Sequence, residues 1–160
     1  METLNLILLS LHNIIRWVVL VLGILLVVRS FLGWIKKWDY QERDQKLTPF
    51  FAGVFDLQIL LGIILFFTKG WGGVLMNAPG EVMKTSALRF FAVEHWLLMI
   101  VAAVLVHIGS AQVKKATTSL NKYKRAAIWF TIAMLLVLAS IPWPGMSAAR
   151  PLFGLFGIVF

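Results

Sequence analysis

The sequence predicts an all-α integral membrane protein, a four-helix bundle with both termini on the non-cytoplasmic side. Of its 160 residues, 60% are hydrophobic and only 14% are charged, whereas soluble domains carry roughly 25% charged residues. When a chain of this size folds, about 30% of the surface of the unfolded chain stays exposed. A soluble fold could therefore not bury all of these apolar side chains away from water. Lipid is therefore the expected solvent for most of the chain.

A membrane-spanning helix needs about 20 mainly apolar residues, and four apolar runs have approximately this length. The first run follows Met1-Glu2-Thr3, which lacks a basic residue, so we expect a retained helix rather than a cleaved signal peptide. The fourth run contains no charged residue and ends at Pro142, because proline cannot continue a helix. We expect one membrane domain over residues 1–160, with spans at about residues 4–32, 50–68, 88–111 and 126–142.

Two segments are not expected to span the membrane. Residues 69–87 contain too many turn-forming residues for one continuous helix: Gly70, Gly72, Gly73, Pro79 and Gly80. We expect an outer loop here, with at most a short interfacial helix. The apolar tail, residues 151–160, is too short to cross a bilayer. It is expected to fold against the outer interface or a partner subunit.

Basic residues predict the orientation of the spans. Ten of them lie in or beside the connectors that follow the first and third spans, and four lie on the opposite side. Cytoplasmic segments carry the excess of Lys and Arg, so both termini are expected on the other side of the membrane.

Composition also excludes several classes of function. The net charge of +8 is explained by span ends and anionic headgroups, and no nucleic-acid binding is expected. The chain has no cysteine, which excludes disulfides, iron–sulfur clusters, thiolate ligation of haem and covalent haem attachment.

Two histidines lie at matching depth in separate spans. His12 is about eight residues into the first span, or roughly 12 Å, and His95 is seven residues into the third, or roughly 11 Å. Paired imidazoles on facing helices can hold a haem iron. The alternative is a hydrogen bond between helices, to Asn13, Ser10 or a backbone carbonyl, and Met99 is an alternative axial ligand.

Charged residues accompany these histidines. Arg16 lies one turn deeper than His12 and needs a buried partner, for which Glu94 on the third span is the expected residue. Arg89 lies outward of His95, where it can pair with haem propionates or extend its head to the interface.

A second polar pair is expected nearer the cytoplasmic side. Asp56 and His107 lie at similar depth, with Arg29 near the same level. They can form a proton path, since intramembrane Asp and His often relay protons. A second haem, for which no fourth histidine exists, and a simple hydrogen-bonded contact near the interface are the alternatives.

Three segments resemble small bacterial four-span membrane proteins described as cytochrome b-like: Leu11-His12-Asn13-Ile14-Ile15-Arg16-Trp17, Arg89-Phe90-Phe91-Ala92-Val93-Glu94-His95 and Ser140-Ile141-Pro142-Trp143-Pro144. More distantly, the layout is similar to copper-resistance-type and protoporphyrinogen-oxidase-type four-helix membrane proteins. The resemblance implies a bacterial cytoplasmic (inner) membrane location. It also implies a non-covalent haem b held by His12 and His95, with Arg16, Arg89 and Glu94 nearby.

We therefore expect a membrane haem b protein that transfers electrons in a respiratory or quinone-dependent process, as an oxidoreductase or an electron-transfer subunit. Its expected partners are the lipid bilayer, a quinone or redox protein, and further copies or subunits of a complex. Two alternatives remain open. One is a cofactor-free proton or ion conductor that uses Asp56, Glu94, His107 and Arg16, and the other is a structural subunit of a larger complex.

Overall fold

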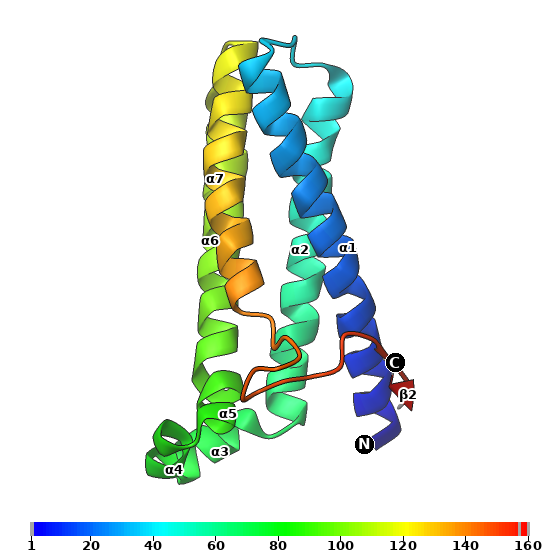
Figure 1. Cartoon of the computed structure of the whole chain (residues 1–160), viewed down its shortest axis with the longest axis vertical. Coiled ribbons are helices and arrows are strands. Elements are labelled where there is room, and N and C mark those ends of the chain that lie inside the picture. Colours follow the sequence, from blue (N-terminus) through cyan, green and yellow to red (C-terminus); the bar gives the residue numbers. More distant parts are fainter. Residues whose placement is uncertain (1, 157, 160) are drawn as a thin grey trace.

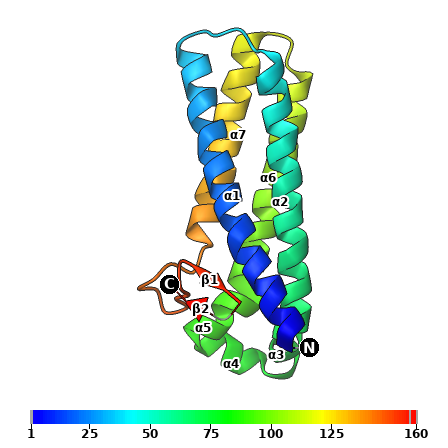
Figure 2. The same ribbon diagram turned by 90° about the vertical axis from the view of Figure 1, so that its right-hand side faces the viewer.

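The computed structural model describes residues 2–156 and 158–159, and within them four long helices form an antiparallel bundle (Figure 1). These helices are α1 (Glu2–Ile35), α2 (Glu42–Thr68), α6 (His95–Lys115) and α7 (Ser119–Ala139). Helix α1 packs against α2 and α7, and α6 packs against the same two helices. The start of α1 and the tail lie at one end, called here the terminal end. The opposite end holds the connectors α1–α2 and α6–α7 and is called the connector end (Figure 2).

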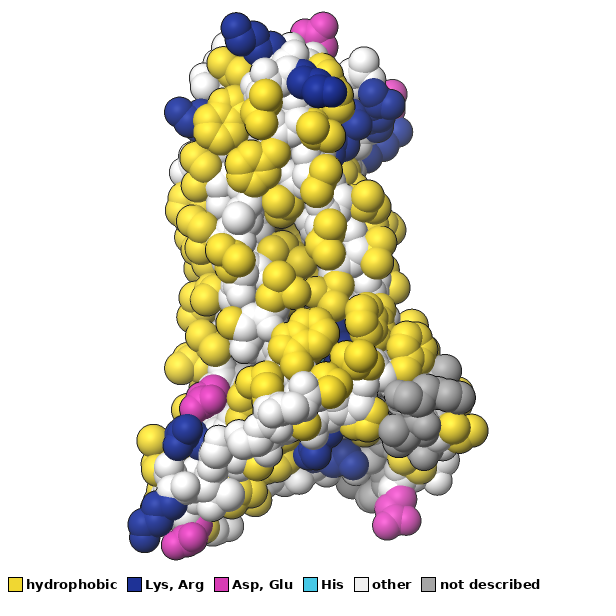
Figure 3. Space-filling model, viewed as in Figure 1, with side chains coloured by type: hydrophobic (Ala, Val, Ile, Leu, Met, Phe, Trp, Pro, Cys, Tyr) yellow, Lys and Arg dark blue, Asp and Glu magenta, His cyan; other side chains and the backbone are white. Residues whose placement is uncertain are grey.

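Three segments of the described chain are long and apolar enough to cross a membrane: α1, α2 and the helical stretch Ser86–Lys115. The face of the bundle seen in Figure 3 is largely apolar along its length, and most Lys and Arg side chains on it gather towards the two ends. The molecule is therefore a membrane-type helical bundle. Helix α7 is not among the three, because its first two turns carry Lys122, Lys124 and Arg125 and leave only 14 residues, 126–139, free of charge.

Helix α2 begins at Glu42, eight residues before the expected start of the second span at residue 50. The expected span at residues 50–68 lies within this helix, and its boundaries in the membrane stay a prediction. The helix runs through Pro49, where one backbone donor is missing. Its start is fixed by Asp44, whose side chain accepts a hydrogen bond from the Gln41 backbone nitrogen (3.0 Å).

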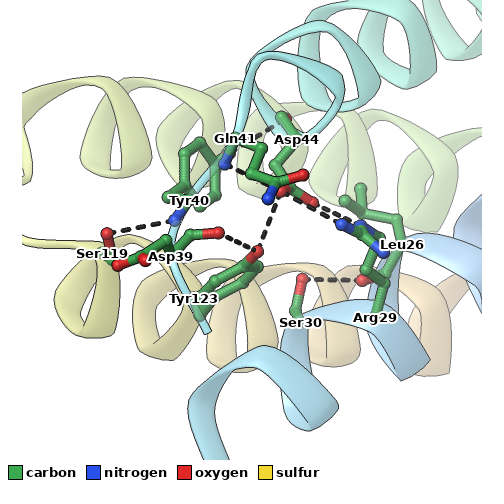
Figure 4. Close-up of polar contacts among 9 residues, drawn as sticks. All are labelled: Leu26, Arg29, Ser30, Asp39, Tyr40, Gln41, Asp44, Ser119 and Tyr123. Carbon is green, nitrogen blue, oxygen red and sulfur yellow. Dashed lines mark hydrogen bonds and ion pairs between the residues drawn. The ribbon is translucent and has the colours of Figure 1, made fainter. Parts of the chain in front are cut away.

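Asp44 is also the centre of a buried polar network at the connector end (Figure 4). Its carboxylate is 3% exposed and pairs with the Arg29 guanidinium through two hydrogen bonds. The Tyr123 hydroxyl of α7 donates to the same carboxylate (2.9 Å), and the Tyr40 hydroxyl donates to the Asp44 carbonyl oxygen (3.0 Å). One carboxylate therefore ties α1, α2 and α7 together.

At the terminal end, the expected loop 69–87 consists mainly of short helices: α3 (Trp71–Asn77), α4 (Pro79–Lys84) and α5 (Ser86–Arg89). Gly70 precedes α3 with φ of 77°, a left-handed conformation that glycine adopts without strain. The turn-forming residues thus break the segment into pieces, as expected, but helical structure within it is more extensive than expected.

A π-helical segment, η1 (Phe90–Glu94), joins α5 to α6 immediately before His95. The His95 backbone nitrogen donates to the Phe90 carbonyl, five residues back. Such π turns are rare and occur frequently at functional sites. This turn changes which side chains of the third span share a face.

The tail folds back on the first half of α1. A short antiparallel hairpin, β1 (Gly154–Leu155) with β2 (Ile158–Val159), lies beside that helix. The Phe156 backbone nitrogen donates to the Ser10 hydroxyl (2.8 Å), and the Trp17 indole donates to the Leu152 carbonyl (3.0 Å). The tail therefore contributes to the wall of the terminal end.

Candidate functional site

A cavity of about 780 Å³ opens at the terminal end between α1, α2, η1 and α6. Its walls are largely apolar, with a few polar groups that include His12 and His95. Small-molecule sites typically have volumes of about 300–1,000 Å³ and this kind of lining. The cavity is thus large enough for a cofactor or an amphiphilic ligand.

The two imidazoles meet inside the bundle. His12 on α1 and His95 at the start of α6 have ring centroids 6.4 Å apart, with an angle of 74° between the ring planes. The predicted convergence of these histidines is confirmed. Counting 1.5 Å per residue along two helices that enter from the same end was sufficient to predict it.

His95 is oriented by a backbone carbonyl and by aromatic rings. Its Nδ1 atom lies 2.7 Å from the carbonyl oxygen of Ser140, the residue after α7. Because a carbonyl can only accept, Nδ1 carries the proton and Nε2 keeps its lone pair. The rings of Phe90 and Phe91 lie beside the imidazole. A carbonyl acceptor on the second ring nitrogen is typical of metal-binding histidines.

His12 is held from α2. The Gln58 side-chain nitrogen donates to the His12 carbonyl oxygen (3.0 Å) and lies 3.3 Å from the His12 Nε2 atom. Gly62, one turn further along α2, gives the ring its space, because a Cβ atom there would lie 3.3 Å from His12 Cε1. Gln58 and Gly62 were not predicted as site residues. Gln58 was visible as a polar residue in a span, but its partner was not.

Three buried polar atoms at this cavity have no hydrogen-bond partner: His12 Nδ1, Arg16 Nε and Gln58 Oε1. Buried polar groups are nearly always satisfied, so a cluster of unsatisfied atoms points to a bound ligand or water. All three residues belong to the cavity wall. The cavity wall therefore contains polar groups whose hydrogen bonds the described part of the chain does not complete.

The expected pairing of Arg16 with Glu94 was wrong. Arg16 donates instead to Asn13 Oδ1 (3.1 Å) and to the Leu152 carbonyl of the tail. Glu94 pairs with Arg89, five residues earlier, at 2.6 Å. The π turn explains this, because a five-residue repeat brings positions i and i+5 onto one face.

This pairing also changes the role expected of Arg89. Its guanidinium donates to Glu94 and to the Met83 carbonyl (3.1 Å). Among the described residues, the cavity wall includes neither Arg89 nor Glu94. It does include three cations, Arg16, Arg150 and Lys69. Of these, only Arg16 was predicted from the sequence as a site residue.

The distance between the two rings matches that of two imidazoles on one metal ion, and it also matches a direct edge-to-face contact between two rings. A bond from a metal to an imidazole nitrogen is about 2.0–2.1 Å long, so two such rings on one ion have centroids about 6.3 Å apart. The observed separation is 6.4 Å. No group of three or more His, Asp or Glu side chains in the described residues could hold a bare metal ion. Haem needs only axial ligands from the protein. Met99 also lines the cavity.

Asp56 and His107 form the expected contact, with His107 Nε2 2.8 Å from Asp56 Oδ1. The pair lies on the outside of the bundle, with half of each side chain exposed. Arg29 is engaged with Asp44 instead. Asp56 lies 14 residues after the start of α2.

Comparisons with known proteins do not assign this site. No protein-family model, curated protein or solved structure matches the chain. The features that characterise the site are its two facing imidazoles, its apolar cavity and the nearby cations.

Proposed function

We propose that this protein is an integral-membrane haem b protein that transfers electrons, and that His12 and His95 are the residues that would hold the haem. The observation that carries the proposal is the pair of facing imidazoles, 6.4 Å apart on the wall of a large apolar cavity. The unpartnered atoms of His12, Arg16 and Gln58 support it, because unsatisfied buried polar groups are rare and their clustering beside one cavity is typical of a binding site.

Haem would supply one-electron redox chemistry, and the protein would supply ligation, orientation, exclusion of water and charge. The Ser140 carbonyl oxygen fixes the proton on His95 Nδ1 and so directs the Nε2 lone pair away from it. Gln58 and Gly62 hold the His12 ring against α2. Apolar walls keep the local dielectric low, which raises the influence of each nearby charge on the iron.

Arg16 and Arg150 are the proposed partners of the haem propionates, with Lys69 as a third cation at the cavity. Arginine suits this role because its planar donors pair with carboxylates in a bidentate manner. Arg150 already lies over the Phe91 ring at 4.6 Å, which holds its guanidinium beside the cavity. These residues take over the role expected of Arg89.

The proposal includes an arrangement in the membrane. Helix α7 packs along α1 and α6, two helices that are apolar and long enough to cross. We infer that its apolar segment crosses beside them as a fourth span. In this arrangement the connector end, with ten basic residues, would face the cytoplasm, and the haem would lie towards the other side of a bacterial inner membrane. The electron donor is proposed to be a quinol or a redox protein.

The test is the reduced-minus-oxidised visible spectrum of the protein purified from haem-replete cells. We expect b-type bands from the parent chain and their loss in His12→Ala and in His95→Ala. His107→Ala is the matched control, because it removes a histidine of α6 outside the cavity, and its bands should persist. Colourless parent protein, or bands that survive both substitutions, would overturn the proposal. Colourless protein that moves protons in liposomes would support the conductor instead.

A further inference from the structure

The acid–base pair on the outside of the bundle is the feature that the proposed function does not use. His107 Nε2 and Asp56 Oδ1 are 2.8 Å apart, and the side chains are 57% and 50% exposed. Asp56 belongs to α2 and His107 to α6, so the pair bridges two helices on one face of the bundle. We call this surface the α2–α6 face.

The pair lies deep within the apolar part of both helices. Between Lys46 and Lys69, α2 carries one charged residue, Asp56, which is ten residues from the first and 13 from the second. At 1.5 Å per residue these separations are about 15 and 20 Å, which places Asp56 near the centre of a hydrocarbon layer about 30 Å thick. His107 is seven residues, or about 11 Å, from Lys114.

A hydrocarbon environment is energetically unfavourable for such an ionisable pair. Ionisable side chains in membrane spans nearly always face protein or a water-filled cavity, because hydrocarbon cannot solvate them. Among the described residues, the cavity at the terminal end is lined by neither Asp56 nor His107. Apart from their contact with each other, the two side chains would meet only hydrocarbon in a single chain, so a polar group from outside that chain would stabilise them.

The surroundings of the pair are apolar and open to close approach. Leu60 on α2 and Val104 on α6 are 54% and 51% exposed. Gly53, one turn before Asp56, has no atom within 4 Å of the position a Cβ would occupy. Small residues at a membrane helix surface allow another helix backbone to come near. The α2–α6 face thus has the polar pair at its centre and apolar or small residues around it.

We propose that two copies of this chain associate through the α2–α6 face, so that Asp56 of each lies against the partner subunit's His107. A surface with an acid and a base side by side is complementary to itself after a two-fold rotation, which is the requirement for a symmetric dimer. A second copy supplies both missing groups at the same depth. The proposal does not depend on haem.

Cysteine cross-linking tests this directly, because the natural chain contains no cysteine. Leu60→Cys places a thiol on the α2–α6 face, and Leu135→Cys on α7 is the control, with matching residue type and exposure (54% and 60%). Purified protein is reconstituted at a low protein-to-lipid ratio and treated with a bis-maleimide. We expect covalent dimers from Leu60→Cys and also from Val104→Cys, and monomers from Leu135→Cys. Monomers at all three positions, or equal dimer yields, would overturn the proposal.

A second experiment tests the role of the polar pair. Asp56→Ala and His107→Ala are each introduced into the Leu60→Cys background, and helical content is checked by circular dichroism. We expect loss of the cross-linked dimer in both variants with helical content retained. Unchanged dimer yield in both would contradict the proposed contact. Unfolding of these variants would leave the cross-linking pattern of the three single-cysteine chains as the deciding result.

Discussion

Removing the Asp44 carboxylate should destabilise the bundle more than any comparable change at the connector end. In Asp44→Ala, the Arg29 guanidinium loses two hydrogen bonds, and the buried Tyr123 hydroxyl and the Gln41 backbone nitrogen each lose one. Breaking a buried ion pair costs about 3–5 kcal/mol. Because the Arg29 side chain is 26% exposed, water recovers part of this, and we expect about 3 kcal/mol.

The assay is thermal unfolding in detergent, followed by the fluorescence of the seven tryptophans. For a chain of this length, about 3 kcal/mol corresponds to a melting temperature about 6–12 °C lower. Asp44→Asn keeps an acceptor for Tyr123 and should cost less, about 1–2 kcal/mol. Glu42→Gln removes an exposed pair with Lys46, both side chains being more than 75% exposed, and should change stability by less than about 0.5 kcal/mol. Equal shifts in Asp44→Ala and Glu42→Gln would refute the reasoning.

Three further predictions concern packing, the tail and pH. Gly33→Ala would bring a Cβ within 2.6 Å of the Tyr123 ring, so melting should show a loss of about 1–3 kcal/mol; an unchanged melting temperature would contradict this contact. Ser10→Ala removes the acceptor of the Phe156 backbone nitrogen, so hydrogen exchange of that amide should become faster, and equal protection would count against the docked tail. Burial raises the pKa of the Tyr40 phenol. Above about pH 10 the Tyr40 phenol keeps its proton in the folded state but loses it in the unfolded state. The free energy of unfolding should therefore fall as pH rises past that value. Tyr40→Phe should make this pH-dependent loss of stability smaller.

The parts of the fold that depend on counting along a helix could be predicted from the sequence. His12 and His95 converge because each lies a similar number of residues from the same end of the bundle. The contact between Asp56 and His107 was predicted in the same way. Counting residues along the helices did not show that this pair lies on the outside of the bundle.

The parts that depend on contacts between distant segments could not be predicted. The start of α2 is stabilised by Asp44 through Arg29, 15 residues earlier, and through Tyr123 in another helix. Local patterns contain no sign of such a network, whereas Pro49 indicated a break.

Contacts between distant segments also limited what could be predicted about the candidate site. The π turn before His95 redirects Glu94 towards Arg89, and no residue pattern indicates a five-residue turn at that point. Ser140 acts through its backbone carbonyl, which any residue type could supply. Helix periodicity therefore predicted which two histidines meet, but not the groups that orient them.

The most direct test of the central claim is the low-temperature electron paramagnetic resonance spectrum of the oxidised protein. If His12 and His95 both hold a haem iron, the two imidazoles would give a low-spin signal. We expect that signal in the parent protein and a high-spin signal, or none, in His12→Ala and His95→Ala. A purified parent protein without a low-spin haem signal would contradict the account.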